Sequence, residues 1–85
     1  MGSYSVEIKR SAAKEIEGLP RKDRGRIIER IRALADEPRP AGSQKLSARE
    51  AYQMRQGNYR IVYTVSDADR LVTIAAVAHR RDAYR

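Results

Sequence analysis

Apolar and polar residues alternate at the start of the chain, over residues 4–9, and this period of two predicts a half-buried strand. The apolar spacing then becomes helical. Ser11 is placed to cap a short helix, because a serine hydroxyl accepts a free N-terminal amide, and Gly18 is a residue type that often ends a helix. We therefore expect one strand followed by one short helix.

A second, longer helix is predicted from Leu19-Pro20 onward, since proline suits the first turn of a helix. Its apolar residues recur at helical spacing and form one stripe, which consists of Ile27, Ile28, Ile31, Leu34 and Ala35. The other side of this helix is basic and carries Arg21, Lys22, Arg26, Arg30 and Arg32. Pro38 and Pro40 prevent the helix from continuing. The two helices are expected to form a hairpin whose apolar sides cover a sheet.

The second half of the chain is typical of strands. The candidates are residues 45–46, 51–56, 59–65 and 71–78, of which 59–65 is the clearest because it is rich in Tyr, Ile and Val. A turn is expected over residues 66–70, which hold two aspartates. The order of elements predicts one α+β domain over residues 1–85. Its mainly antiparallel sheet would have four or five strands, with the helix hairpin packed on one face.

Gly57-Asn58 is a suitable two-residue hairpin loop, and such a loop fixes the register of the strands on either side of it. Successive residue pairs then alternate between the two faces of the sheet. The face packed against the helices would carry Tyr52, Met54, Ile61 and Tyr63. The opposite face would carry Gln53, Arg55, Arg60 and Val62.

This register sets Arg55 directly opposite Arg60, which is unfavourable in a sheet because like charges repel. The arrangement becomes favourable when an anion lies between the guanidinium groups, since arginine binds phosphate through two parallel hydrogen bonds. The alternative is a pair of exposed arginines that splay apart or pair with a nearby carboxylate. The pair is therefore a candidate phosphate site.

Charge and composition narrow the chemistry of such a site. The chain has 18 Lys and Arg against 11 Asp and Glu, a formal net charge of +7, so we expect a polyanionic partner such as nucleic acid, or an acidic protein. It has no cysteine and one histidine, His79, which argues against thiolate catalysis and zinc sites. No acidic cluster suggests two-metal catalysis, so neither a metal nor another cofactor is expected.

The location expected from the sequence is the cytoplasm. No signal peptide is recognisable, because the N-terminus lacks an apolar run. No segment approaches the ~20 apolar residues that a membrane-spanning helix needs, so no membrane partner is expected.

A polar tail, residues 79–85, follows directly on the last apolar run. That strand could bring side chains of the tail beside the two arginines, namely His79, Arg80 or Arg81, and Tyr84. Histidine and tyrosine can transfer protons, and arginine can stabilise a pentavalent phosphorane. Cleavage of RNA by its own 2′-hydroxyl needs only a base, an acid and a charge stabiliser. The other interpretation is a frayed, solvated chain end.

Two segments together resemble the RelE/ParE toxin superfamily, on its RelE side: residues 52–63 (YQMRQGNYRIVY) and residues 77–85 (VAHRRDAYR). The resemblance covers essentially the whole chain, including Leu19-Pro20 and Lys45-Leu46. It implies a toxin of a type II toxin–antitoxin operon that a small acidic antitoxin neutralises. RelE toxins enter the ribosomal A site and cleave mRNA to a 2′,3′-cyclic phosphate, so the ribosome and mRNA are implied partners.

The resemblance also implies roles for individual residues. Arg60 and Arg80 match arginines of the family, Tyr84 matches a C-terminal tyrosine, and Arg55 matches a position that is often lysine. Gln53 departs from the pattern, because it stands where well-studied members have a catalytic lysine and glutamine cannot exchange a proton.

We expect Arg60 and Arg80 to hold the scissile phosphate, supported by Arg55 and Arg81. The proton would be handled by Tyr84 or, as second choice, by His79, which falls where some members have lysine. The residues expected to contact RNA elsewhere are Lys45, Gln53, Arg26 and Arg30. Two alternatives remain: a ParE-like poison of DNA gyrase without nuclease activity, and a degenerate toxin that only binds an antitoxin or regulates.

Overall fold

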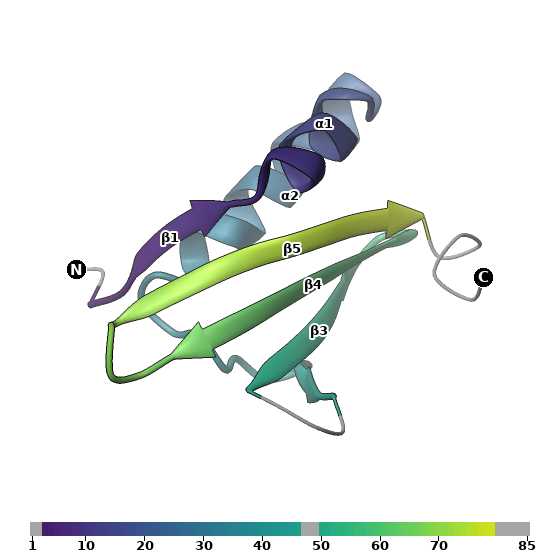
Figure 1. Ribbon diagram of the computed structural model, residues 1–85. Coiled ribbons are helices and arrows are strands. Elements are labelled where there is room, and N and C mark those ends of the chain that lie inside the picture. Colours follow the sequence, from purple (N-terminus) through teal and green to yellow (C-terminus); the bar gives the residue numbers. More distant parts are fainter. Residues whose placement is uncertain (1–2, 47–49, 80–85) are drawn as a thin grey trace.

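The computed structural model describes residues 3–46 and 50–79 of the chain (Figure 1). Along the sequence the elements are β1 (Ser5–Ile8), α1 (Arg10–Glu17), α2 (Arg21–Ala33), β2 (Gln44–Lys45), β3 (Ala51–Gln56), β4 (Tyr59–Ser66) and β5 (Leu71–His79). The predicted order of one strand, two helices and a series of strands is confirmed.

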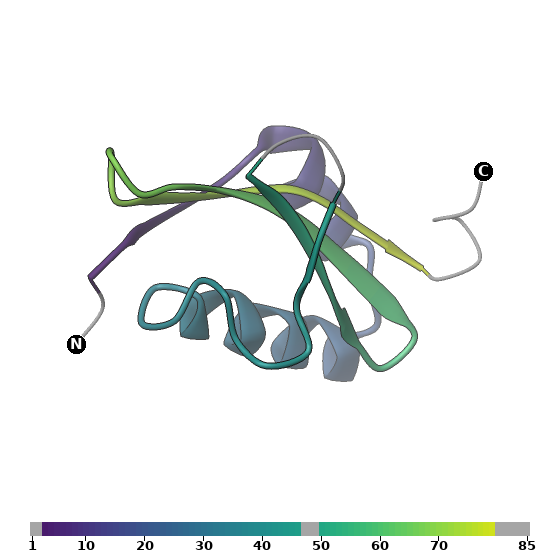
Figure 2. The ribbon, with the colours of Figure 1, turned by 90° about the horizontal axis from the view of Figure 1, so that it is seen from below.

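All five strands belong to one sheet in the order β1-β5-β4-β3-β2. β1 runs parallel to β5, and the other neighbouring pairs are antiparallel. The parallel pair is possible because the two helices carry the chain from β1 across one face of the sheet before β2 begins. Figure 2 shows α2 running along that face. The expected α+β fold with a mainly antiparallel sheet is confirmed.

The hairpin between β3 and β4 has the register that its loop predicts. Gln56 pairs with Tyr59, Arg55 with Arg60 and Met54 with Ile61. Gly57 has a φ of 61°, a conformation that glycine adopts at little cost and that the first position of a type II′ turn requires. The local turn thus decides which side chains of the hairpin face the helices.

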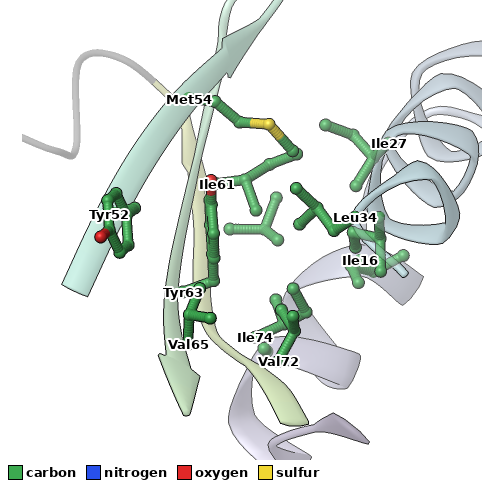
Figure 3. Close-up of a cluster of buried hydrophobic side chains, with 13 residues drawn as sticks. Ile16, Ile27, Leu34, Tyr52, Met54, Ile61, Tyr63, Val65, Val72 and Ile74 are labelled. Carbon is green, nitrogen blue, oxygen red and sulfur yellow. The ribbon is translucent and has the colours of Figure 1, made fainter. Parts of the chain in front are cut away.

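The hydrophobic core lies between this hairpin and the two helices (Figure 3). Met54, Ile61 and Tyr63 are fully buried and belong to one cluster with Ile27 and Leu34, as the apolar stripe of α2 predicts. The cluster also includes Ile31 and Tyr52. The Tyr63 hydroxyl donates to the Pro38 carbonyl at 2.8 Å, so the one polar atom that the ring brings into the core has a partner.

A β-bulge in β5 keeps this core continuous. Val62 pairs with Ala76, but the next residue, Tyr63, pairs with Ile74. Ala75 is therefore an extra residue in β5 that has no paired residue on β4. Because side chains alternate strictly in an unbroken strand, Ile74 and Val77 would otherwise point to opposite faces. The extra residue lets both enter the core, where they are 0% and 2% exposed.

Ser11 does not cap α1, contrary to the prediction. The helix begins at Arg10, and its N-cap is Lys9, which makes no side-chain capping bond. The reason is that Lys9 still donates its amide to the Ile74 carbonyl at 3.0 Å, so the chain passes from strand pairing into the helix within one residue. Gly18 follows α1 as predicted, but with a helical φ of −78°.

The loop after α2 is fastened to the sheet by Arg39, a residue that the sequence pattern did not single out. Its guanidinium donates to the Tyr52 hydroxyl at 2.7 Å, to Glu50 at 3.0 Å and to Asp67 at 3.0 Å. Asp67 also accepts the Tyr4 hydroxyl at 2.6 Å. This Arg39 clasp therefore ties together the loop after α2 with the ends of β3 and β4 and the start of β1.

The clasp is expected to make folding stability depend on pH. Hydrogen bonds from Arg39 lower the pKa of both Glu50 and Asp67 below the ordinary carboxyl range. A carboxyl whose pKa is lower in the folded state stabilises the fold above its unfolded pKa of ~4, and this contribution is lost as the pH falls through the folded value. We expect Arg39→Ala to lower the unfolding midpoint at pH 7, and the difference from the unmodified chain to shrink as the pH falls below the ordinary carboxyl pKa toward about pH 3. Circular dichroism melts across this pH range measure both effects.

The matched control is Arg10→Ala, which removes one exposed arginine outside the clasp. An Arg39→Ala deficit that stays constant from pH 7 to pH 3 would show that the two carboxyls are not the origin of the effect.

Candidate functional site

The face of the sheet away from the helices carries the arginine pair. Arg55 of β3 lies directly opposite Arg60 of β4, and their neighbours on this face are Gln53, Val62 and Ala78. Arg55 is exposed and Arg60 is half-buried, with its Nε shielded from solvent. The predicted pairing of Arg55 with Arg60 on the face away from the helices is confirmed.

The neighbours that the strand register gives to the pair are small or neutral side chains. Ala78 is the β5 residue paired with Arg60, and Ala76 is paired with Val62, so the described residues of β5 place small side chains beside Arg60. None of the neighbours that the strand register gives to the pair is acidic. Gln53 donates its side-chain amide to the Gln44 side chain at 2.9 Å. A phosphate over this face would meet two permanent cations and neutral amides.

His79 lies on the other face of the sheet from Arg60, which corrects the expectation that it joins the arginines. It pairs with Tyr59, whereas the residue paired with Arg60 is Ala78. Its ring stands edge-on to the Tyr59 ring, with 5.5 Å between the ring centroids. The alternation of side chains along β5 is the cause, since only every second residue can face the arginines.

Tyr59 lies next to His79 on this face, and the sequence pattern did not predict a functional role for it. Its hydroxyl donates to the Asp23 carboxylate at 3.3 Å, and a hollow of about 380 Å³ beside it is lined by Leu19, Pro20 and His79 among others. Burial, and then the Asp23 charge, raise the pKa of Tyr59 above its ordinary value near 10. The phenol therefore stays protonated at neutral pH and is poorly suited to act as a base.

Glu15 holds the end of β5 that leads to the tail. β1 pairs with β5 only as far as Ile74, so the outer edge of β5 is open beyond that point. The Glu15 carboxylate of α1 accepts the backbone amide of Val77 at 2.9 Å on this edge. α1 thereby fixes β5 one residue before Ala78, the partner of Arg60.

We expect Glu15→Ala to expose this amide and to speed the hydrogen exchange of Val77 roughly tenfold, since one hydrogen bond to a charged group is lost. Glu15→Gln keeps a carbonyl oxygen at the same place and is expected to retain most of the protection. Amide exchange followed by NMR gives the result residue by residue. Equal protection of Val77 in both variants would mean that Glu15 does not hold this strand end.

The other residues expected to contact RNA are spread over different surfaces. Gln53 lies beside the arginine pair. Lys45 is on the opposite face of β2 from Gln44 and lies 3.5 Å from Glu50, at the Arg39 clasp. Arg26 and Arg30 lie on α2 near the free edge of β3. Arg80, Arg81 and Tyr84 lie outside the described residues.

Within residues 3–46 and 50–79, no three His, Cys, Asp or Glu side chains are grouped so that they could hold a metal ion. The helices of the same part of the chain are too short or too polar to span a membrane.

Comparison with known proteins gives the family. A family model described as the ParE toxin of the type II toxin–antitoxin system parDE matches residues 6–84. Toxin RelE of Mycobacterium tuberculosis is 31% identical over 84 residues, which cover 96% of this chain and 87% of that protein. Toxin RelG of the same organism is 29% identical over 84 residues, covering 96% of this chain and 97% of the relative.

Solved structures of toxin–antitoxin complexes contain chains with a similar fold. A RelBE2 toxin–antitoxin complex of M. tuberculosis holds a chain that is 26% identical, with a TM-score of 0.80 over 92% of this chain and 99% of that one. The archaeal RelE–RelB complex of Pyrococcus horikoshii gives 26% identity and a TM-score of 0.81, over 92% of this chain and 96% of the other. The sheet that carries the arginine pair thus has the fold of these relatives, and the chain belongs to the RelE/ParE superfamily of toxins of type II toxin–antitoxin systems.

Proposed function

We propose that the chain is a RelE-type toxin that cleaves mRNA on the ribosome, in the cytoplasm, without a metal cofactor. The observation that carries the proposal is the pair of arginines, Arg55 and Arg60, set opposite each other on the sheet face away from the helices, where the strand register gives them no acidic neighbour. Two guanidinium groups supply the fixed positive charge that a developing phosphorane needs. The similarity to Toxin RelE supports the RelE side of the superfamily, for which the resemblance in sequence implies mRNA as the substrate.

The reaction in this proposal is an attack within the RNA. The 2′-oxygen of one nucleotide forms a bond to the adjacent phosphorus, the bond from phosphorus to the 5′-oxygen of the next nucleotide breaks, and a 2′,3′-cyclic phosphate remains. The 2′-hydroxyl loses a proton and the leaving 5′-oxygen gains one. Arg60 and Arg80 would hold the phosphate, and Arg55 and Arg81 would add to the positive charge.

Proton transfer is assigned to Tyr84 in this proposal, with His79 as the weaker candidate. His79 is disfavoured because it shares its face with Tyr59 and not with the arginine pair. Gln53 offers no proton, so the site depends on the ribosome to align the 2′-hydroxyl with the phosphorus. Orientation of this kind can lower a barrier by ~7–11 kcal/mol.

A two-part assay tests this function against its main alternative. The purified chain is expected to cleave mRNA in programmed ribosomes, to leave free RNA largely intact, and to leave DNA gyrase active. The ParE-like alternative has one finding in its favour, the ParE description of the matching family model. Inhibited gyrase with intact mRNA would establish that alternative, and inactivity in both assays would leave a degenerate toxin that only binds its antitoxin.

We also propose that a small acidic antitoxin binds the apolar groove between β1 and α2. The groove measures about 440 Å³ and is lined by Val6, Ile8, Ile28 and Ile31, with Arg32 among the lining residues. Ile8 is 42% exposed, the one large apolar side chain of the described residues that is so open to solvent. The net charge of +7 favours an acidic partner, and the similar solved structures are toxin–antitoxin complexes.

Ile8→Asp is expected to weaken the complex with the cognate antitoxin, sought in the neighbouring reading frame, by roughly ten- to a hundredfold, because burying an isoleucine contributes ~1.5–3 kcal/mol. Isothermal titration measures the change. Glu7→Ala, one residue earlier on the opposite face of β1, serves as control and should bind nearly as the unmodified chain does. Equal affinity of both variants would place the antitoxin elsewhere.

A further inference from the structure

The edge of β3 is open along its second half, beside α2. β2 pairs with β3 at Gln53 and Tyr52, and within residues 3–46 and 50–79 no strand pairs with residues 54–56 on this side. Backbone groups alternate in direction along a strand, and the Ala51 carbonyl accepts from Leu46 on the β2 side. The amide and carbonyl of Arg55 therefore face the same open side, away from β4.

Two hollows of about 420 Å³ each lie along this edge, and Arg30 of α2 lines both. The first also touches Gln44, Gln53 and Arg55, and the second touches Arg26, Glu29 and Gln56. We call this surface the β3-edge trench. Its charged lining residues are three arginines and one glutamate, a balance of +3 − 1 = +2.

Arg30 provides an independent indication of a ligand. Its Nε is shielded from solvent and has no hydrogen-bond partner among the described residues. Arg30 is half-buried and lines both hollows. Because this guanidinium lines both hollows and its Nε has no acceptor among the described residues, an oxyanion in either hollow would lie against a cation whose hydrogen-bonding capacity is not fully used.

We propose that the β3-edge trench binds the phosphodiester backbone of single-stranded RNA, with one phosphate at each hollow and Arg30 between them. The inference rests on the proposed RNA substrate and extends the path of that RNA over the surface. Gln53 and Arg55 belong both to the trench and to the arginine face, so a single RNA strand can pass from the trench to the arginine face. An acidic peptide fits less well, since residues 54–56 offer a single outward amide, that of Arg55, and strand pairing needs several.

The test uses a short RNA in which every 2′-hydroxyl is methylated, so that it cannot be cleaved. Its affinity is measured by fluorescence anisotropy at several salt concentrations. Arg30→Ala is expected to weaken binding roughly tenfold at ~0.1 M salt and to make the salt dependence shallower by ~0.7 in log–log slope, the value for one phosphate contact on a single strand. Addition of the RNA should also shift the NMR signal of the Arg55 amide.

The matched control is Arg21→Ala, an equal loss of charge nine residues earlier on α2, about half a turn out of phase with Arg30. Arg30→Met keeps the aliphatic stem, and should reproduce the Arg30→Ala effect while its circular dichroism melt shows a folded chain. Equal losses in Arg21→Ala and Arg30→Ala would reduce the effect to net charge and overturn the proposal. So would a shift of the Arg55 amide by a glutamate-rich peptide but not by the RNA.

The result is distinguishable from a failure of the proposed function. Binding of the methylated RNA is scored without cleavage, so Arg30-dependent binding by a chain that does not cleave mRNA would refute the nuclease and retain the trench. Cleavage of mRNA on the ribosome, together with RNA binding that does not depend on Arg30, would refute the trench and retain the nuclease.

Discussion

Arg60→Ala is expected to slow mRNA cleavage on the ribosome by roughly 10²–10³-fold, the usual loss when one donor to a developing charge is removed. Arg60 is half-buried and faces Arg55 across the hairpin, whereas its β5 partner Ala78 has no charged group, so removing the Arg60 guanidinium takes one of the two paired cations from this face. The loss should appear mainly in the rate at saturating ribosomes, because the interaction strengthens as the phosphorane forms. Single-turnover cleavage of a defined mRNA, read by primer extension, gives that rate.

Comparison variants separate the roles in the site. Arg80→Ala should show a loss of the same size if it shares the phosphate with Arg60. Tyr84→Phe removes only a hydroxyl, and should cost more activity than His79→Ala if the tyrosine transfers the proton. The reverse order would move the acid/base role to His79 and leave the phosphate-binding assignment intact.

Two results would contradict the assignment of Arg60. One is growth inhibition by Arg60→Ala with intact mRNA and inhibited gyrase, which indicates a ParE-like poison. The other is cleavage abolished by a metal chelator under conditions that preserve the ribosome, which indicates that a metal and not the arginines carries the charge.

Ile61→Ala is expected to lower the free energy of unfolding by ~2–5 kcal/mol, the range for removing a large aliphatic side chain from a packed core. Ile61 is 0% exposed and lies in the cluster that joins the hairpin to the helices (Figure 3). A domain of 85 residues has a total stability on the order of 4–13 kcal/mol, so the substitution removes a large share of it. Urea unfolding measures the loss.

The control is the next residue along β4. Val62 is only half-buried and lies on the arginine face, so Val62→Ala should cost clearly less than Ile61→Ala. Similar losses at the two positions would mean that the two faces of β4 are equally buried, contrary to the observed register.

The sequence alone determined the hairpin and everything that depends on it. The bounds of residues 51–56, the pairing of Arg55 with Arg60 and the buried position of Met54 all follow from the alternation of side chains and a two-residue loop, which are local properties of adjacent residues. The apolar stripe of α2 was equally readable, because helical spacing is local as well. Family membership followed from the same segments.

Only the tertiary structure decided the features that join distant parts of the chain. His79 lies away from the arginines because the β4–β5 register pairs Ala78 with Arg60, and this register includes a bulge that no local spacing indicates. The contact of Glu15 with Val77 and the clasp of Arg39 with Asp67 span 62 and 28 residues. Such contacts depend on where whole strands and helices come to rest against one another, whereas sequence periodicity reports only which neighbours share a face.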